Sequence, residues 1–456
     1  MNQPVCSQPA QRLRSNVRWN LIGNMVYAFG QWLQLVIVAR MGGPAAVGAY
    51  AFALALTAPV MMLASLCLRF MQASDARRAY AFREYLGLRS ATTAAAVMAI
   101  ALIAWGTGAG RAGWAVLLPI SVMRAADAIS DVYYGVWQQH ERMGVIAGGL
   151  MLNAVSSAAL MTLAAVLGGG VPGAAIGSML GSCAALIFVH LRTWSDAELR
   201  RAAAAGSRVA WRRLVQLAVE AAPLGLSVSL GSFQQNVPRF FLGHYAGEAA
   251  LGMFAAASQL TNAGDIVTGA LGAAASPRLA SLRAGGEAGA FRGLTRKLVL
   301  VGALLGAAGV TLSALAGRWI LEVLYRPEFG SGARTLVVLS AAAGLGFVAS
   351  LLCYALSSAR VFAVQPLLLV VTLIVLIACC AVLVPRYGGE GAALALVVAS
   401  SVQALLSGLA LRRVQRGVQR FRGSRATQAA FTGHFPLALR QTSPAYRSLD
   451  LPNENQ

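Results

Sequence analysis

The sequence predicts an all-α integral membrane protein with about twelve transmembrane helices. Its composition is 57% hydrophobic and only 12% charged, whereas soluble domains carry about 25% charged residues. Its apolar stretches match the ~20 helical residues that cross a bilayer core of ~30 Å. Glycine is abundant, at 48 residues, and small residues let transmembrane helices approach each other closely. These observations exclude a soluble globular protein.

The twelve expected spans divide into two sets of six. The first set covers residues 19–39, 45–68, 90–108, 114–137, 145–167 and 173–191, and the second covers 214–237, 251–274, 298–316, 335–356, 363–384 and 391–411. The domains expected from these spans are a cytoplasmic N-terminus (1–18), an N-lobe (19–191), a cytoplasmic linker (192–213), a C-lobe (214–411) and a disordered cytoplasmic tail (412–456).

The distribution of positive charge predicts the orientation of the spans. The chain has 37 Lys and Arg against 16 Asp and Glu, a net charge of +21. If the N-terminus is cytoplasmic, the inner segments hold 29 basic residues. The outer segments hold the seven arginines Arg40, Arg111, Arg239, Arg318, Arg326, Arg334 and Arg386. The positive-inside rule therefore places both termini in the cytoplasm, and short basic clusters between apolar runs argue against a nucleic-acid partner.

An internal repeat predicts two lobes with the same orientation. Residues 39–56 (ARMGGPAAVGAYAFALAL) align with residues 243–260 (GHYAGEAALGMFAAASQL) at an offset of 204, with seven of eighteen positions identical. The matching positions include Gly43/Gly247, Gly48/Gly252 and Ala51/Ala255, and Gln31 falls on Gln235. Six spans separate the copies, so the lobes are related by an axis along the membrane normal, as in transporters with a central cleft. Chance similarity between Ala/Gly-rich stretches is the alternative.

The fourth span carries the densest set of polar residues. Arg124, Asp127, Asp131, Tyr134 and Gln138 recur at spacings of three and four, which places them on one helix face. Arg124 lies near the expected bilayer midplane, where a charge is costly and usually faces a cavity or a partner. Two interpretations are open. Either Arg124 binds an anion and Asp127 or Asp131 gates a cleft by protonation, or Arg124 and Asp127 neutralise each other within a structural stripe.

The first span carries an uncharged polar stripe. Its members are Asn20, Asn24, Tyr27, Gln31 and Gln34. Amides and phenols both donate and accept hydrogen bonds, which suits sugar hydroxyl groups. The same groups can form hydrogen bonds between helices. Five such residues on one helix face favour a role in lining a cavity.

The second half offers fewer candidates. Glu220 lies three residues before Pro223 in the seventh span, and Asp265 lies in the eighth. At their expected depths the two carboxyl groups could meet and couple transport to a proton or sodium gradient, or each could be a neutral, hydrogen-bonded acid. Gln235 and Arg239 lie near the outer end of the seventh span. Arg239 either faces the outer mouth of the cleft or caps the membrane surface.

No enzyme signature is found in the sequence. The four histidines are scattered, without partners at metal-ligand spacing, and there is no phosphate-binding loop of the Walker type. The sequence therefore predicts no catalytic residues, no metal site and no cofactor.

The motifs resemble those of polysaccharide-biosynthesis flippases of the O-antigen and exopolysaccharide (Wzx-like) type, within the multidrug/oligosaccharidyl-lipid/polysaccharide exporter superfamily. The resemblance runs from about residue 16 to residue 411. Its pieces include 39–42 (ARMG), 47–50 (VGAY), 127–135 (DAISDVYYG), 222–225 (APLG), 236–239 (NVPR), 251–255 (LGMFA), 276–280 (SPRLA) and 388–393 (GGEGAA).

The resemblance implies two MATE-like lobes that open alternately to each side of a bacterial inner membrane. The implied substrate is a polyprenyl-diphosphate-linked oligosaccharide, and the implied partners are a polysaccharide polymerase and a chain-length regulator. A cation-coupled multidrug exporter, a peptidoglycan-precursor flippase, a membrane glycan polymerase or ligase and a structural scaffold are the alternatives. A polymerase or ligase is expected to need a large outer loop, and the chain has only short ones. A scaffold leaves the buried charges unexplained.

Overall fold

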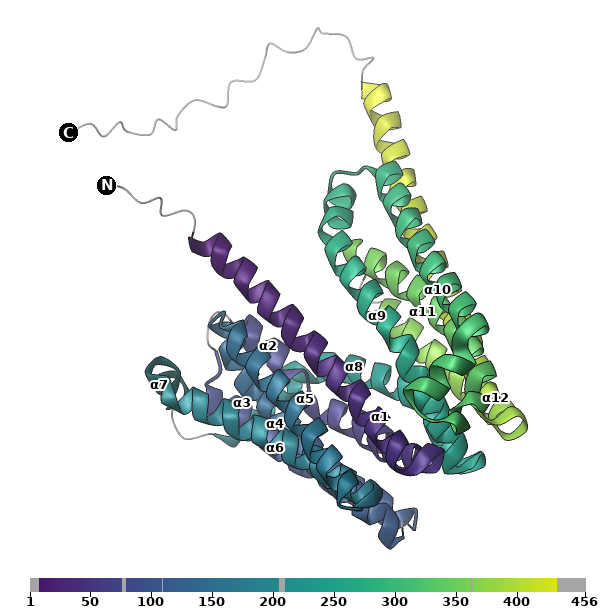
Figure 1. Cartoon of the computed structure of the whole chain (residues 1–456). Helices are drawn as coiled ribbons and strands as arrows, with labels where there is room; N and C mark the ends of the chain where they lie inside the picture. The colour runs from purple at the N-terminus through teal and green to yellow at the C-terminus, as the bar shows by residue number, and fades with distance from the viewer. Residues whose placement is uncertain (1–7, 76–78, 109, 205–209, 362–363, 433–456) are drawn as a thin grey trace, which may run out of the picture. The chain divides into compact units, whose positions relative to one another are not determined.

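The computed structural model of the chain describes residues 8–75, 79–108, 110–204, 210–361 and 364–432. Over these residues it contains helices and no strand, which confirms the all-α prediction (Figure 1). The helices are α1 (Gln8–Ser65), α2 (Leu68–Ser74), α3 (Phe82–Gly106), α4 (Arg111–Gln139), α5 (Met143–Val166), α6 (Gly170–Ser195), α7 (Ala197–Ala204), α8 (Trp211–Tyr245), α9 (Gly247–Ala284), α10 (Ala288–Leu324), the 3-10 helix η1 (Pro327–Gly332), α11 (Ala333–Ser358) and α12 (Val364–Thr432).

The helices agree with a multi-pass membrane protein. Within the described ranges, nine are long and apolar enough to cross a bilayer. Two of these, α1 and α12, each cover most of two expected spans and break at a glycine with positive φ, Gly43 and Gly388 respectively. Helix α9 is not among the nine but contains the expected span 251–274. The count of twelve crossings and the orientation of the termini remain predictions.

The expected linker and tail differ from the structure in detail. Helix α6 ends at Ser195, and the short helix α7 lies within the expected linker. The chain divides into a compact unit, Met1–Ser407, and a second unit, Gly408–Gln456. Helix α12 continues through Thr432, so that part of the tail is helical rather than disordered. Residues 433–456 lie outside the described part of the chain.

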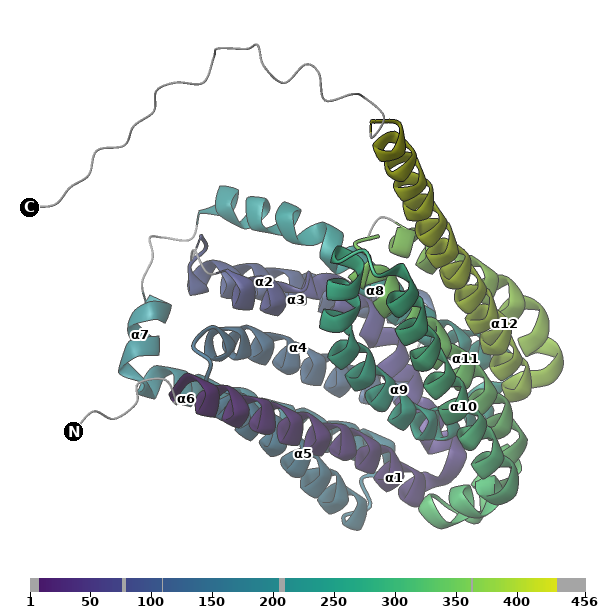
Figure 2. The same ribbon diagram turned by 90° about the horizontal axis from the view of Figure 1, so that it is seen from above.

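Within the first unit, α1 contacts helices from both halves of the sequence. Helices α4, α5 and α6 pack against one another, and α9, α10 and α11 do the same, as Figures 1 and 2 show. Helix α1 packs on α5 in the first half and on α8 and α9 in the second. Most of the contact between the two halves is therefore made by α1.

The internal repeat is structural, because its two copies contact each other reciprocally. Gly43 and Gly247 both adopt positive φ, at 69° and 80°. A Cβ placed on Gly48 would lie 1.9 Å from the carbonyl oxygen of Glu248, and one placed on Gly252 would lie 1.8 Å from that of Pro44. Positions 44 and 248 also correspond at the offset of 204. Such an exchanged pair of contacts is the signature of a local two-fold relation, and it favours a true repeat over chance similarity.

Candidate functional site

Two polar cavities adjoin in the first unit and share Arg124. The first, here the α4 cavity, has a volume of about 320 Å³ and is lined by the charged residues Arg69, Arg89, Arg124, Asp127 and Asp131. The second, here the amide cavity, has a volume of about 330 Å³ and is lined by the polar residues Gln31, Gln34, Gln235, Asn236, Gln259, Asn262, Arg124 and Arg239. Ala58, Met62 and Ser232 also belong to both. Four of the five residues of the predicted stripe, all but Gln138, thus line a cavity, with Arg124 at the junction.

Arg124 makes no hydrogen bond or ion pair with any residue that the structure describes, and its Nε is buried without a partner. A buried guanidinium nitrogen without an acceptor is costly, and the described residues supply no acceptor for this one. Asp127, one helical turn away, instead accepts a hydrogen bond from Asn153 Nδ2 at 2.9 Å. Arg124 and Asp127 therefore form no direct ion pair in this conformation, and whether their charges balance each other stays open.

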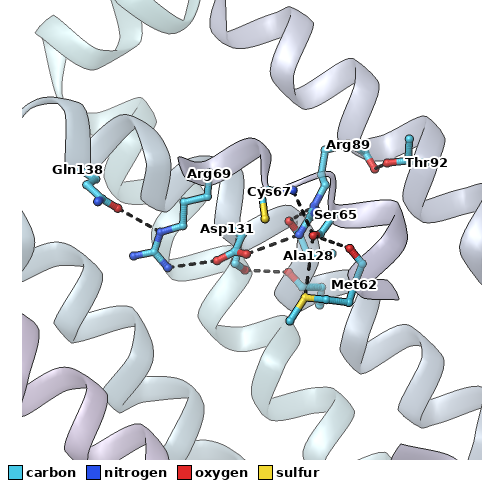
Figure 3. Close-up of polar contacts among 11 residues, drawn as sticks. Met62, Ser65, Cys67, Arg69, Arg89, Thr92, Ala128, Asp131 and Gln138 are labelled. Atoms are coloured by element: carbon cyan, nitrogen blue, oxygen red, sulfur yellow. Dashed lines mark hydrogen bonds and ion pairs between the residues drawn. The ribbon is translucent and has the colours of Figure 1, made fainter. Parts of the chain in front are cut away.

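Asp131 binds two arginines at once (Figure 3). Its Oδ1 lies 3.2 Å from Arg69 on α2, and its Oδ2 lies 3.5 Å from Arg89 on α3. Arg69 Nε also donates to Gln138 Oε1 at 3.2 Å, and Arg89 Nε donates to the carbonyl of Ala128 at 2.8 Å. This network joins three helices and leaves more positive than negative charge around the α4 cavity.

Arg69 and Arg89 were not expected in the site. The expected spans place both in the cytoplasmic segment 69–89. In the structure, Arg89 lies two turns inside α3 and its side chain is only 6% exposed. Arg239 was expected at the outer mouth or membrane surface, and the structure places it within α8, lining the amide cavity. The remaining inner arginines and Lys297 still far outnumber the outer arginines, so the predicted orientation is unchanged.

The amide cavity holds a second incompletely bonded guanidinium. Arg239 donates from one terminal nitrogen to Asn236 Oδ1 at 3.2 Å and from the other to Ser258 Oγ at 3.4 Å, while its buried Nε has no partner. Arg124 and Arg239 are close enough to interact electrostatically. Because the two side chains come from different halves of the sequence, the cavity lies between the halves.

The polar stripe of the first span divides between the cavities. Asn24 and Tyr27 line the α4 cavity, whereas Gln31 and Gln34 line the amide cavity. Gln34 Oε1 also accepts a hydrogen bond from Tyr50 at 3.3 Å. Asn20 lies outside both cavities, exposed, and its Oδ1 accepts from Asn24 Nδ2 at 3.0 Å.

Three further polar residues line the cavities, namely Tyr134, Gln235 and Asn153. Tyr134 lines the α4 cavity and Gln235 the amide cavity, as their helix faces predict. Asn153, on α5, is 5% exposed and was missed, because a lone asparagine in an apolar span gives no stripe. The sequence signal for Gln259 and Asn262 was their spacing on one face of the eighth span, beside Asp265.

Glu220 and Asp265 are not brought together. Both are exposed, and neither lines the cavities described above. Glu220 Oε1 accepts from Gln216 at 3.5 Å, and no contact between the two carboxyl groups occurs. Among the described residues, no group of three His, Cys, Asp or Glu side chains could hold a metal ion.

We therefore expect Glu220→Gln and Asp265→Asn each to leave transport near the wild-type level, because neither carboxylate reaches the cavities. Surface polymer, compared at equal protein amount in the membrane, is the measurement. A strong loss of polymer in either variant, with normal protein amount, would restore the ion-coupling interpretation of that acid.

Comparisons with known proteins agree with this architecture. Residues 13–283 match the family described as "Polysaccharide biosynthesis protein". The chain is 24% identical, over 397 residues, to the capsular polysaccharide biosynthesis protein CapF of Staphylococcus aureus, covering 86% of this chain and 97% of that protein.

Two solved membrane transport proteins share the fold. An inward-facing multidrug resistance MATE family transporter of the MOP superfamily aligns with a TM-score of 0.71 and 15% identity, covering 88% of this chain and 99% of that one. The lipid II flippase MurJ, in an inward closed conformation, aligns with a TM-score of 0.66 and 12% identity, covering 91% and 93%. The chain thus has a MATE-like helical fold, and it belongs to the polysaccharide biosynthesis protein family.

Proposed function

We propose that this protein is a flippase of the bacterial inner membrane. It moves polyprenyl-diphosphate-linked oligosaccharide units outward by alternating access, for exopolysaccharide, capsule or O-antigen (lipopolysaccharide) synthesis. The observation that carries the proposal is the pair of guanidinium groups, Arg124 and Arg239, which open from two halves of the chain onto one amide-lined cavity.

The lining of the amide cavity suits the head group of such a substrate. A diphosphate accepts charge-assisted, bidentate hydrogen bonds from guanidinium groups more readily than from other side chains. The amides of Gln31, Gln235 and Gln259 can each donate and accept, as sugar hydroxyl groups require. No carboxylate is among the described residues that line this cavity. That absence disfavours the runner-up, an exporter of cationic drugs, because a cation would meet two arginines and no counter-charge.

A third cavity suits the lipid. It has a volume of about 590 Å³, lies between α1 and α9, and is lined mainly by apolar residues such as Leu21, Phe29 and Ile266. It shares Gln31, Gln259 and Asn262 with the amide cavity. An amphipathic substrate could therefore place its head group among the amides and arginines while its chain stays in contact with apolar surface.

A peptidoglycan-precursor flippase would need the same diphosphate chemistry, and family membership favours the polysaccharide substrate over it. On this proposal the delivered units pass to a polysaccharide polymerase and a chain-length regulator on the outer side. A membrane polymerase or ligase is disfavoured, because none of the cavity residues forms a nucleophile–base pair of the kind such chemistry uses.

Replacing Arg124 tests the proposal most directly. We expect Arg124→Ala to reduce export at least about tenfold, because the diphosphate loses a charge-assisted bidentate contact. Arg124→Lys should keep part of the activity, since an ammonium group is a point charge rather than a planar fork. Export is read from surface polymer and from lipid-linked precursor that accumulates on the cytoplasmic face, with the membrane protein level measured in parallel.

Two further variants serve as controls. Arg111→Ala removes an exposed arginine from the same helix and should export normally. Arg124→Ala combined with Asp127→Ala should insert normally and still accumulate precursor. Full export by this double variant would mean that Arg124 only balances Asp127, and it would overturn the ligand role.

A further inference from the structure

Asp127 is a carboxylate without a basic hydrogen-bonding partner. It lines the α4 cavity, and its Oδ1 is held by Asn153 Nδ2 at 2.9 Å. The same amide nitrogen lies 3.1 Å from Ser182 Oγ, and Ser157 Oγ donates to Asn153 Oδ1 at 3.4 Å. Helices α5 and α6 thus fix the carboxylate beside Arg124 but beyond ion-pair distance from it, so the guanidinium stays open to another anion.

The surrounding charges leave Arg124 as the cation that Asp127 affects most. Arg69 on α2 and Arg89 on α3 are both bound to Asp131. The other groups that face Asp127 are neutral or acidic. They are Tyr27 and Tyr50 from α1, Tyr134 and Asp131 on α4 itself, Asn153 from α5, and Ser182 and Cys183 from α6.

We propose that Asp127 is the resident counter-anion of Arg124 and regulates its affinity for an anionic ligand. This inference rests on the proposed function, because it assumes that Arg124 binds a phosphate group. An anion on Arg124 would lie about one helical turn, ~5 Å, from Asp127. The ionised carboxylate repels that anion in a partly desolvated cavity. The neutral, protonated carboxyl group does not, so a proton bound at Asp127 strengthens anion binding at Arg124.

The sign of the effect gives a direct test. The dissociation constant of inorganic pyrophosphate is measured for the full-length chain in detergent, from about pH 5 to about pH 9, for the wild type and for Asp127→Asn. Titration of pyrophosphate changes both dissociation constants, and their ratio removes the part common to the two proteins, so the remaining pH dependence requires the carboxyl group of Asp127. We expect the dissociation constant of the wild type, divided by that of Asp127→Asn, to be close to one at the acid end. This ratio should rise about tenfold at the alkaline end, where only the wild type carries the repelling charge.

Control variants separate the possible outcomes. Asp265→Asn, which neutralises an exposed carboxylate outside the cavities, should follow the wild type at every pH. Asp127→Ser, a second neutral variant of different shape, should follow Asp127→Asn. A ratio that does not change with pH in either neutral variant would overturn the counter-anion role. So would an affinity of the wild type that rises when sodium replaces choline at alkaline pH, which would assign Asp127 to a sodium ion instead.

The same assay distinguishes failure of this inference from failure of the proposed function. If Arg124→Ala binds pyrophosphate as tightly as the wild type, the proposed anion site is wrong, whatever the pH profile. If binding requires Arg124 and is indifferent to the charge of Asp127, the anion site holds and only the counter-anion role is lost.

Discussion

Replacing Gly252 with alanine should destabilise the protein and abolish export. The added Cβ would lie 1.8 Å from the carbonyl oxygen of Pro44 and 2.8 Å from the backbone nitrogen of Gly48. Both atoms are backbone, so no side chain can move aside, and the two copies of the repeat must separate. Overpacking typically costs 1–3 kcal/mol, and we expect about 3 kcal/mol or more here because backbone is displaced. Thermal unfolding in detergent and surface polymer are the measurements.

The reciprocal contact supplies a paired variant and a control. Gly48→Ala should be as damaging as Gly252→Ala, because its Cβ would lie 1.9 Å from the carbonyl oxygen of Glu248. At Gly269, on the same helix as Gly252, an added methyl group would have no heavy atom of another part of the chain within 4 Å. Gly269→Ala should therefore be neutral or slightly stabilising, by up to ~1 kcal/mol of helix propensity. If Gly252→Ala unfolded at the same temperature as the wild type, the two copies of the repeat would not pack closely.

The second large effect is expected at Asp131. Asp131→Asn leaves Arg69 and the buried Arg89 without their shared counter-charge. Breaking a buried ion pair from one side typically costs ~3–5 kcal/mol, but the Asp131 side chain is 41% exposed, so we expect about 2–3 kcal/mol. The readout is the thermal unfolding midpoint of the purified protein.

Arg69→Gln is the matched control for this prediction. It leaves Asp131 paired with Arg89, and the Arg69 side chain is itself 31% exposed, so the loss should stay below ~1 kcal/mol. Equal destabilisation by Arg69→Gln and Asp131→Asn would contradict the view that the uncompensated buried Arg89 dominates the cost.

The face of the fourth span was predictable because helical periodicity alone defines it. Arg124, Asp127, Asp131 and Tyr134 line one cavity, as spacings of three and four require. The internal repeat showed that Gly48 and Gly252 occupy corresponding positions, but it did not predict that each packs against the backbone of the other copy. Periodicity says which residues share a face, but it does not say what that face meets.

Arg89 and Arg239 were missed for the same physical reason. The expected spans have the ~20 residues that cross an apolar core, whereas α3 and α8 are 25 and 35 residues long. Residues assigned to loops, such as Arg239, therefore lie inside helices and reach the cavities. For Arg89 a local signal existed. Glu84 accepts a hydrogen bond from the backbone nitrogen of Ala81 at 2.8 Å, and a glutamate at the third helical position is a mark of a helix start.

Glu220 and Asp265 show a different limit. Their depths were estimated from helical rise, which gives position along an axis but not direction around it. Two helices at the same depth bring side chains together only if both faces turn inward. The helix faces that carry these acids are exposed, and only the packing of α8 and α9 decides that.

The basic groups that line the two polar cavities are all arginines, and this has a thermodynamic consequence for energy coupling. Guanidinium groups stay charged at every physiological pH, so a change of charge by proton uptake would fall on a carboxyl group such as that of Asp127. Proton uptake then always makes the cavities more attractive to an anion, and by reciprocity a bound anion favours proton uptake. The proton and the anionic substrate would then cross the membrane in the same direction, as in symport, rather than in opposite directions. An inward proton gradient acting here would oppose outward delivery, whereas a membrane potential negative inside would assist it, by ~2.3 kcal/mol per charge for each 100 mV.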